Sequence, residues 1–427
     1  MKNIEVPALA RVEGEGGLFI GLQDGKAVEI RLDIYEPPRF FEGFLVGRFL
    51  QEVPDITARI CGICPVAYQM SSAFALEQAL GVTIHPQARA LRRLMYCGEY
   101  IESHALHIYL LQAPDMLGVQ SALELAATAP EVVKNALRLK KIGNQLLKAI
   151  GGRSVHPVNV CVGGFYSWPK VADLKALLPD LEWGLAASIE CARWAATLPY
   201  PELEIDYEFV ALHHPNEYGV IEGEILSSKG RVLTIPEFEH GYIEEHVRHS
   251  NALHSHTVDG NTYLVGPLAR LNLNHQQLLP AAKQAIKDSG VELPIRNPYK
   301  SLLARAIELV HFYEEAIQLV NSYKPEGRAH VELKLKAGGG TGATEAPRGL
   351  LYHRYQIDDQ GLVQFAKITP PTAQNLPRIE ADLFALAPKI VELSHDEATL
   401  TAEHLVRAYD PCISCATHFL KLKVENV

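Results

Sequence analysis

Two pairs of cysteines at opposite ends of the chain constrain its fold more than any other feature of the sequence. RICGIC places Cys61 and Cys64 near the start of the 427 residues, and DPCISC places Cys412 and Cys415 near the end. A C-x-x-C turn lets two thiolates face one metal ion, and two such turns make a four-sulfur site. If the pairs share a metal, the fold must bring both ends of the chain together.

Three other kinds of cysteine site fit parts of this pattern. The pairs of a structural zinc ribbon usually lie roughly 15–20 residues apart, whereas about 350 residues separate them here. A thioredoxin-like redox site needs one pair beside a βαβ unit. An iron–sulfur cluster also suits four thiolates, but the arginine-led RICG and proline-flanked DPC segments favour something more specific. Three single cysteines, Cys97, Cys161 and Cys191, are expected to be small core residues.

Charge and hydropathy exclude several classes of partner. The chain carries 40 Lys and Arg against 50 Asp and Glu, a net charge of −10, and no long basic run. This balance argues against nucleic acid and against an anionic membrane surface. No stretch of about 18 apolar residues is free of charge, so no membrane span is expected. The odd total of seven cysteines argues against a disulfide framework, and the N-terminal residues do not have the pattern of a signal peptide.

The periodicity predicts an α+β fold that is mainly α. Residues 1–35 are β-rich, with apolar residues alternating around a hairpin turn at Asp24 and Gly25. A second β-rich region spans about 203–270, and residues 337–349 are interpreted as a glycine-rich loop. Helices are expected at about 86–117, 118–149, 170–197, 275–289, 298–323 and 378–395. We expect one catalytic domain over 1–427, in which a central helix bundle carries peripheral hairpins and small sheets, and the active site joins the terminal segments.

RICGIC and DPCISC resemble the two signature segments of the large subunits of nickel–iron hydrogenases. The resemblance runs through ordered segments from about residue 7 to residue 418. It implies that all four cysteines bind nickel, while Cys64 and Cys415 also bridge to an iron that carries carbonyl and two cyanide ligands. It further implies an enzyme that oxidises H2 reversibly.

Other segments match the family in order. ARVEGEG resembles the N-terminal R-[IV]-E-G element, which implies that Glu13 relays protons from Cys412. A carboxyl within hydrogen-bond reach of a thiol can accept a proton released in a buried site. Taken alone, Glu13 would instead be an ordinary solvated glutamate on a strand.

RFFEGFLVGR resembles the family's R-G-F-E segment and implies a second metal site. Glu42 and His418 would be ligands, and Ile368 would supply a backbone carbonyl. Carboxylate, carbonyl and water suit magnesium, whereas a histidine ligand is less usual for it. The metal there is therefore magnesium or iron.

Two further segments supply polar groups for the site. SHALHIYLLQAPD resembles a helix of histidines that ends in aspartate, here His104, His107 and Asp115. EAPRG resembles the loop that carries the active-site arginine, here Arg348, preceded by Pro347. The resemblance implies that Asp115 and Asp410 hold Arg348 above the metals, where a guanidinium can polarise bound hydrogen. Thr372 would hydrogen-bond a cyanide ligand. The alternatives are ordinary ion pairs and core histidines.

Two departures from the family pattern suggest a branch within it. Tyr68 stands where the family usually has histidine, and Glu15 stands where many members have histidine after R-x-E-G. Neither position is a metal ligand. Both changes resemble the cytoplasmic, nicotinamide-coupled, sulfhydrogenase-like branch, so a cytoplasmic location is expected.

The electrons from H2 must leave the chain. The single cysteines lack cluster spacing, so no iron–sulfur cluster is expected here, and no G-x-G-x-x-G follows a strand. The resemblance implies an iron–sulfur small subunit and flavin-containing, NAD(P)-coupled electron-transfer subunits. A hydrogen-sensing regulatory subunit, sulfur or polysulfide reduction, and a structural subunit of a respiratory complex are the alternatives.

The resemblance also implies maturation. A dedicated protease would cut after His418 and remove residues 419–427, once nickel-insertion proteins have loaded the site. The alternative is a permanent last strand, because LKLKV alternates in hydropathy.

Overall fold

The N-terminal strands form the small antiparallel sheet that their alternating pattern predicts. The computed structural model describes residues 2–23, 26–119 and 121–418. Strands β1 (Lys2–Val6), β2 (Gly16–Gln23) and β3 (Lys26–Ile34) pair in the order β1-β2-β3. The predicted turn at residues 24 and 25 lies outside the described residues. Gln23, directly before it, pairs with Lys26, directly after it.

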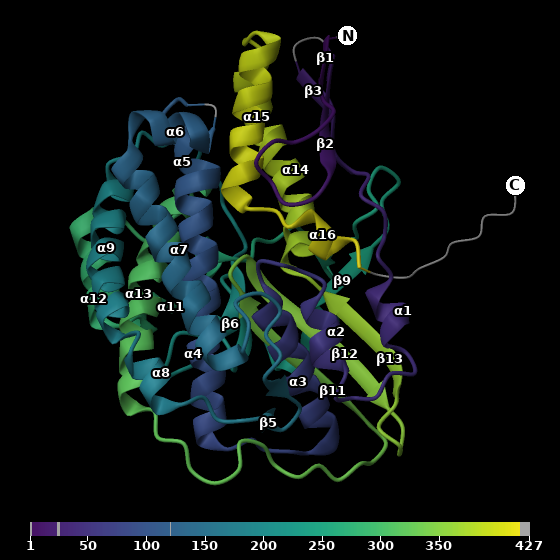
Figure 1. The fold of residues 1–427 in the computed structure, drawn as a ribbon. Coiled ribbons are helices and arrows are strands. Elements are labelled where there is room, and N and C mark those ends of the chain that lie inside the picture. The colour runs from purple at the N-terminus through teal and green to yellow at the C-terminus, as the bar shows by residue number, and fades with distance from the viewer. Residues whose placement is uncertain (1, 24–25, 120, 419–427) are drawn as a thin grey trace, which may run out of the picture.

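Long helices form a layer on one side of the molecule (Figure 1). It contains α4 (Pro86–Leu106), α7 (Pro130–Gly151), α9 (Leu178–Ala196) and α13 (Ser301–Ser322). A Cβ atom at Gly143 would lie 2.6 Å from the Gly98 carbonyl oxygen, so α4 and α7 touch backbone to backbone there. This layer confirms the predicted helix bundle.

Each predicted helical range contains helix, although several of the ranges are divided. The helix expected to continue to residue 117 passes through a π-helical turn at residues 107–112, and the one expected at 118–149 breaks before Pro130. Two long helices that the pattern did not predict are α3 (Pro65–Leu80) and α15, which follows α14. The other helical segments are α1 (Phe41–Leu45), α2 (Val53–Ala58), α5 (Ala113–Met116), α6 (Ala122–Thr128), α8 (Val171–Lys175), α10 (Phe238–Gly241), α11 (Pro267–Asn274), α12 (Pro280–Ser289), α14 (Pro371–Ile390), α15 (His395–Tyr409) and α16 (Ile413–Ala416).

The glycine-rich segment is a strand, so its prediction as a loop was wrong. Strand β11 (Gly338–Ala346) pairs with β12 (Gly349–Ile357), which pairs with β13 (Val363–Thr369). Cβ atoms at Gly340 and Gly342 would lie 2.0 and 2.3 Å from carbonyl oxygens of α3 (Pro65–Leu80). The glycines are there because α3 lies directly on the strand, where no side chain fits.

The second β-rich region is observed as predicted. Its strands are β6 (Val210–His213), β7 (Glu224–Ser227), β8 (Val232–Leu233), β9 (Tyr242–Glu245) and β10 (His254–Thr257), and a further short hairpin joins β4 (Val160–Cys161) to β5 (Gly164–Phe165). All the pairings are antiparallel.

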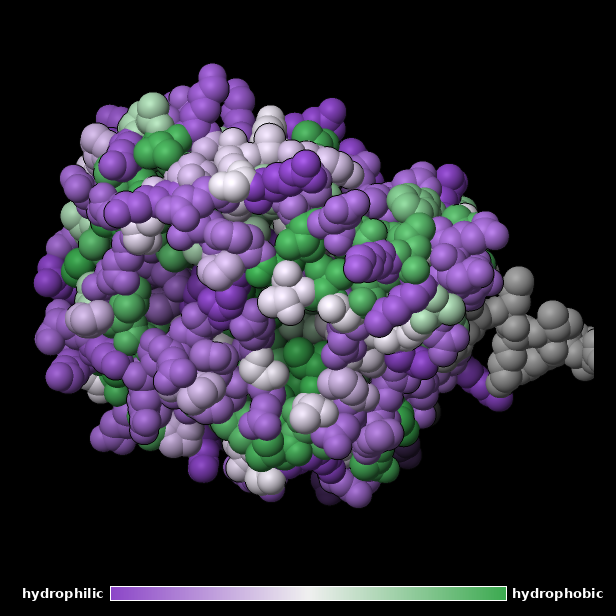
Figure 2. Space-filling model, turned by 90° about the horizontal axis from the view of Figure 1, so that it is seen from below, coloured by the Kyte–Doolittle hydropathy of each residue, from purple (hydrophilic) through white to green (hydrophobic). Residues whose placement is uncertain are grey.

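The first and last parts of the chain meet near the middle of the molecule. Figure 1 shows α16 between the pair α14 and α15 and the sheet β11-β12-β13. A parallel bridge joins Glu13 to Cys412, and α3 begins directly after Cys64. From below, apolar side chains form a band across a mostly hydrophilic face (Figure 2). Within the described part of the chain, every helix is too short or too polar to cross a bilayer.

Candidate metal centre

The fold brings the four predicted cysteines together. All four thiols are buried, and their Sγ atoms lie within 4.8 Å of one another. The Sγ atom of Cys412 is 3.6 Å from that of Cys61 and 2.7 Å from that of Cys415. The Sγ atoms of Cys64 and Cys415 are 4.0 Å apart. This set of soft donors suits nickel and iron, and its spacing fits shared metal ions.

Local backbone geometry fixes each pair. The backbone N–H groups of Ile63 and Cys64 donate to the Cys61 Sγ atom at 3.3 and 3.2 Å. Contacts with Cys412 and the other thiols lower the pKa of Cys61 well below its usual value, while burial raises the pKa of Cys412. The cluster thus favours some thiolate character, as a bound metal requires.

Arg39 ties the two cysteine segments together, and the sequence analysis did not select it. Its Nη2 group donates to the Ile60 carbonyl oxygen at 2.8 Å and also to the Ser414 carbonyl oxygen. Its backbone N–H donates to the Thr417 carbonyl oxygen at 2.6 Å. Its position just before the FFEG segment was the available signal, but only folding reveals that one guanidinium reaches both ends of the chain.

Glu13 lies where the proton-relay prediction requires it. The Cys412 thiol donates to Glu13 Oε2 at 3.0 Å, and the Ser414 N–H donates to the same oxygen at 3.1 Å. The backbone also holds the residue, because the Ile413 N–H donates to the Glu13 carbonyl oxygen at 2.9 Å. A proton can therefore pass directly between the terminal thiol and a carboxylate.

Arg348 pairs with one of its two predicted carboxylates. Its Nε and Nη2 groups donate to the carbonyl and Oδ1 oxygens of Asp410 at 2.9 and 3.0 Å. The Nη1 group is buried and has no hydrogen-bond partner among the described residues. Burial opposes the charge, but Asp410 and the nearby cysteine sulfurs raise the pKa of Arg348 well above its usual value. An unpaired donor near the cysteine sulfurs fits a site built for an additional ligand.

Asp115 corrects the expectation of two carboxylates around Arg348. It accepts from Arg407 Nε and Nη2 at 2.7 and 3.0 Å, lies 2.9 Å from His404 Nε2, and also pairs with Arg11. Burial raises its pKa, but these partners lower it more strongly, so the carboxyl stays charged. Because α15 presents Arg407 and His404 to it, Asp115 supports the helix that ends directly before Asp410.

The three residues predicted for the second metal are also brought together. His418 Nε2 is 2.7 Å from the Ile368 carbonyl oxygen and 3.9 Å from Glu42 Oε1. The Ile368 N–H donates to Glu42 Oε1 at 2.8 Å. Burial lowers the pKa of His418, which favours the neutral imidazole that a metal needs. A carboxylate, a carbonyl and an imidazole fit a divalent cation.

Thr372 contacts a cysteine of the centre, whereas Pro347 contacts Arg270. The Cys412 N–H donates to Thr372 Oγ1 at 2.9 Å, which leaves the hydroxyl hydrogen available for another acceptor. The Pro347 carbonyl oxygen accepts from Arg270 at 2.8 Å. Thr372 thus holds the cysteine segment itself.

The two predicted histidines are buried and neutral. His104 Nε2 is 2.8 Å from Glu308 Oε2, and His107 Nε2 is 2.8 Å from the Arg407 carbonyl oxygen. Burial lowers their pKa values to about 4 and about 3. Their packing therefore agrees with the alternative that His104 and His107 are core histidines.

Glu99 is a second residue that the sequence analysis missed. Its carboxylate accepts from the N–H groups of Val66 and Ala67 at 2.6 and 3.2 Å, at the start of the helix that follows Cys64. Burial raises its pKa well above the usual value. The position lies inside a helical pattern, so nothing in the sequence marks it.

Comparison with known proteins identifies the family. The model of the nickel-dependent hydrogenase family matches residues 39–150 and 229–418. The chain is 35% identical to sulfhydrogenase 1 subunit alpha of Pyrococcus furiosus, over 99% of this chain and 100% of the relative. It is 28% identical to the beta subunit of the NAD-reducing hydrogenase HoxS of Cupriavidus necator, over 98% and 95% of the two chains.

A solved structure agrees with these sequence matches. A chain of an NAD+-reducing [NiFe]-hydrogenase in the H2-reduced state superimposes with a TM-score of 0.87 at 26% identity, over 98% of this chain and 100% of that chain. These matches cover nearly the whole chain. They agree with the site, which has four buried sulfurs and a carboxylate that contacts the Cys412 thiol. The chain therefore belongs to the nickel-dependent hydrogenases, as the catalytic subunit of an oxidoreductase that acts on H2.

Proposed function

We propose that this chain oxidises H2 reversibly at a nickel–iron centre and exchanges electrons with NAD(P) through an iron–sulfur partner. The observation that carries the proposal is the cluster of four buried sulfurs within 4.8 Å, contributed by both ends of the chain. A nickel–iron group bound there would supply the redox and Lewis-acid chemistry that splits H2. Cys61, Cys64, Cys412 and Cys415 would hold the nickel, and Cys64 and Cys415 would also hold the iron.

The surrounding residues have separate tasks in this proposal. Glu13 takes a proton from the Cys412 thiol, across a contact of 3.0 Å. Arg348 presents its unpaired Nη1 group to the centre while Asp410 holds the guanidinium. Thr372 would offer its hydroxyl hydrogen to a cyanide ligand of the iron, which would also carry carbonyl. Asp115 keeps α15 in place through Arg407.

The second metal has a structural task. Glu42, His418 and the Ile368 carbonyl would hold a magnesium or iron ion, and His418 lies three residues after Cys415. A cation there would neutralise the Glu42 carboxylate and fix the C-terminal cysteine segment.

Partners are needed because the chain has no cluster-type cysteine spacing beyond the metal centre. Two segments that contact each other carry exposed apolar side chains: Phe44 is 58% and Tyr166 56% exposed. Gln51 joins their two segments, since its amide exchanges hydrogen bonds of 3.1 and 3.0 Å with the Val162 backbone. We infer that the iron–sulfur small subunit covers this surface and passes electrons to flavin-containing NAD(P) subunits, in a cytoplasmic complex.

Metal analysis of the complex with its partners tests the proposal. We expect one nickel and one iron per chain at this centre, with infrared bands for carbonyl and cyanide. Cys412→Ser and Cys415→Ser should abolish both metals and activity, because a missing thiolate opens the coordination shell. Cys97→Ser, at a buried cysteine outside the centre, is the matched control. Stoichiometric zinc without nickel in active complex would contradict the proposal.

Sulfur or polysulfide reduction is a second candidate activity. It is favoured by the 35% identity to the alpha subunits of sulfhydrogenases 1 and 2 of Pyrococcus furiosus. Hydrogen-dependent sulfide production by the complex would support it, whereas H2 oxidation without sulfide production would exclude it. A sensing role is not favoured, because the relatives are named as hydrogenases.

A further inference from the structure

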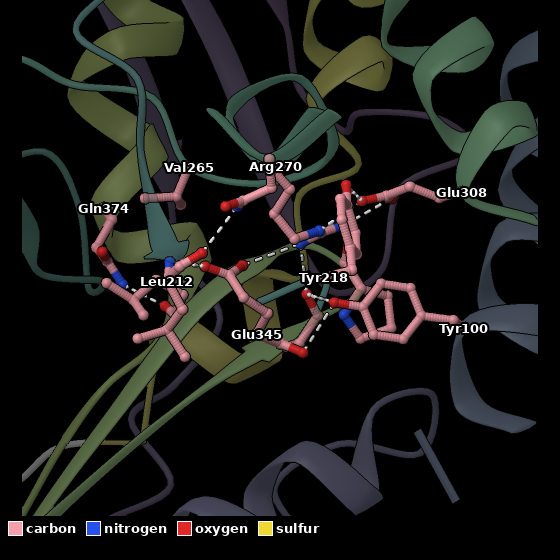
Figure 3. Close-up of polar contacts among 12 residues, drawn as sticks. Tyr100, Leu212, Tyr218, Val265, Arg270, Glu308, Glu345 and Gln374 are labelled. Atoms are coloured by element: carbon pink, nitrogen blue, oxygen red, sulfur yellow. Dashed lines mark hydrogen bonds and ion pairs between the residues drawn. The ribbon is translucent and has the colours of Figure 1, made fainter. Parts of the chain in front are cut away.

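Arg270 uses every N–H group of its side chain inside the protein. The guanidinium is fully buried, and Figure 3 shows it between the carboxylates of Glu308 and Glu345. Its Nε and Nη2 groups donate to the two oxygens of Glu308 at 2.7 and 2.9 Å. Its Nη1 group donates to Glu345 Oε2 at 3.1 Å. These contacts use three of the five donors of an arginine.

The other two donors hold the backbone directly before Arg348. Nη1 also donates to the Ala346 carbonyl oxygen at 2.9 Å, and Nη2 to the Pro347 carbonyl oxygen at 2.8 Å. One planar group therefore fixes two successive carbonyls, a geometry that lysine cannot reproduce.

The carbonyls of Glu345 and Arg348 also have close neighbours. The Tyr100 hydroxyl donates to the Glu345 carbonyl oxygen at 2.9 Å. A Cβ atom at Gly266, the residue before α11, would lie only 2.8 Å from the Arg348 carbonyl oxygen. Because Arg270 lies on α11, one turn after Gly266, this short helix contacts the turn on both sides of Pro347.

The charge of Arg270 is balanced in place. Glu308 also accepts from the Tyr218 hydroxyl at 2.7 Å, and His104 lies 2.8 Å from its other oxygen. Burial alone would raise the pKa of Glu308, but Arg270 and His104 lower it to about 2. A buried arginine with complete hydrogen bonding is rigid, since removing any partner leaves an unsatisfied group in the interior.

We propose that Arg270 is a positioning residue for H2 turnover, which fixes the backbone of residues 345–347 so that the Arg348 guanidinium stays beside the cysteine sulfurs. Neither the family resemblance nor the four-cysteine pattern assigns it a role. The proposal rests on the proposed role of Arg348. Displacing a catalytic group by about 1 Å can cost on the order of 10²-fold in rate. A loosened turn should therefore lower turnover without touching any metal ligand.

Arg270→Lys in the complete complex is the test. The lysine keeps the charge but cannot reach both carbonyls and both carboxylates. We expect kcat for H2 oxidation to fall roughly 10–100-fold, with nickel and iron content unchanged and with shifted infrared bands of the iron ligands.

Arg92→Lys is the matched control. Arg92 is also fully buried and donates to both oxygens of Glu77, at 2.6 and 2.8 Å, and to the Cys161 carbonyl oxygen at 3.1 Å. It therefore resembles Arg270 in burial and pairing but holds the β4–β5 hairpin. We expect a similar loss of thermal stability, with normal kcat per bound nickel and unshifted bands.

Arg348→Lys separates failure of the inference from failure of the proposed role. If Arg270 acts through Arg348, the double variant should be no slower than Arg348→Lys alone. A slow Arg348→Lys beside a normal Arg270→Lys, or fully additive losses, would overturn the positioning role alone. A normal rate for Arg348→Lys would instead remove the proposed catalytic role of Arg348.

Tyr100→Phe is a second test of the positioning role, in case Arg270→Lys does not fold. It removes only the hydroxyl that holds the Glu345 carbonyl and leaves the charges in place. We expect a several-fold lower kcat that disappears in the Arg348→Lys background. An unchanged kcat in this variant would count against positioning through the turn.

Discussion

At the scale of single residues, the centre combines groups from distant parts of the sequence that the motifs identified separately. Glu13 and Cys412 were assigned from the two ends of the chain, and the structure places Cys412 Sγ 3.0 Å from Glu13 Oε2. Arg39, Glu99 and Arg270 could not be found in this way. Each acts through backbone groups brought to it only by folding, which no local pattern encodes.

Glu13→Gln tests the proton relay. The amide keeps the shape and can accept from the Ser414 N–H, but it cannot take a proton from the thiol. We expect normal nickel and iron content together with a loss of H2 oxidation and of hydrogen–deuterium exchange. Glu15→Gln, two residues away, is the control. Normal exchange in the Glu13 variant would show that protons leave by another group.

Arg348→Lys tests the electrostatic role of the arginine. Lysine keeps the charge but loses the planar group that contacts Asp410 while leaving the Nη1 group for the centre. Loss of one oriented electrostatic contact is expected to lower the turnover rate roughly 10²–10³-fold. Metal content should stay unchanged. A near-normal rate would show that the residue is structural.

Glu345→Gln tests a pH effect inside the Arg270 network. Burial raises the pKa of Glu345 from 4.5 to about 7. The folded state therefore favours the protonated form of Glu345. The contribution of this protonation to the free energy of unfolding is complete below pH 4.5 and is lost as the pH rises through 7. A shift of this size corresponds to about 3 kcal/mol. The difference in unfolding temperature between variant and wild type should therefore change across this range, and a constant difference would refute the assignment.

At the scale of secondary structure, periodicity located most helices but misjudged the glycine-rich strand. The long helices have an apolar side that repeats every three or four residues, which sequence reveals. Strand β11 lacks an alternating pattern because Gly340 and Gly342 face the backbone of α3. In the sequence, a run of glycines is typical of a loop. In this fold, the glycines lie where a strand and a helix pack closely. Helix α3, the partner, is buried nearly all round and so has no amphipathic signal.

Gly340→Ala tests this packing. A Cβ atom there would lie 2.0 Å from the Ala75 carbonyl oxygen, which belongs to helical backbone and cannot move easily. We expect a loss of stability of about 1–3 kcal/mol, measured as a lower unfolding temperature. Gly339→Ala is the matched control, because its nearest contact would be an ordinary 3.6 Å. Equal effects of the two substitutions would contradict the close contact of α3 and β11.

At the scale of the whole molecule, the metal centre depends on the joining of the chain ends. Glu13 bridges to Cys412, and Arg39 contacts the carbonyls of Ile60 and Ser414. The distance between the cysteine pairs predicted this joining, because a shared site requires it. The contact of Arg39 with Ser414 was not predictable, since the two residues lie 375 positions apart in the sequence. Metal loading and closure of the C-terminal segment should therefore be coupled.

That coupling leads to a prediction about the mature chain. His418 is 1% exposed, and its Nε2 atom lies 2.7 Å from the Ile368 carbonyl oxygen, so the chain is already in the interior at this residue. Residues 419–427 lie outside the described residues. If a protease cuts after His418 once nickel is bound, the intact mass of active, nickel-loaded subunit should end at His418. The Cys412→Ser chain, which cannot complete the nickel site, should keep all the residues through Val427. A fully active subunit with the mass of the uncut chain would show that the segment is permanent, because activity would then not require its removal.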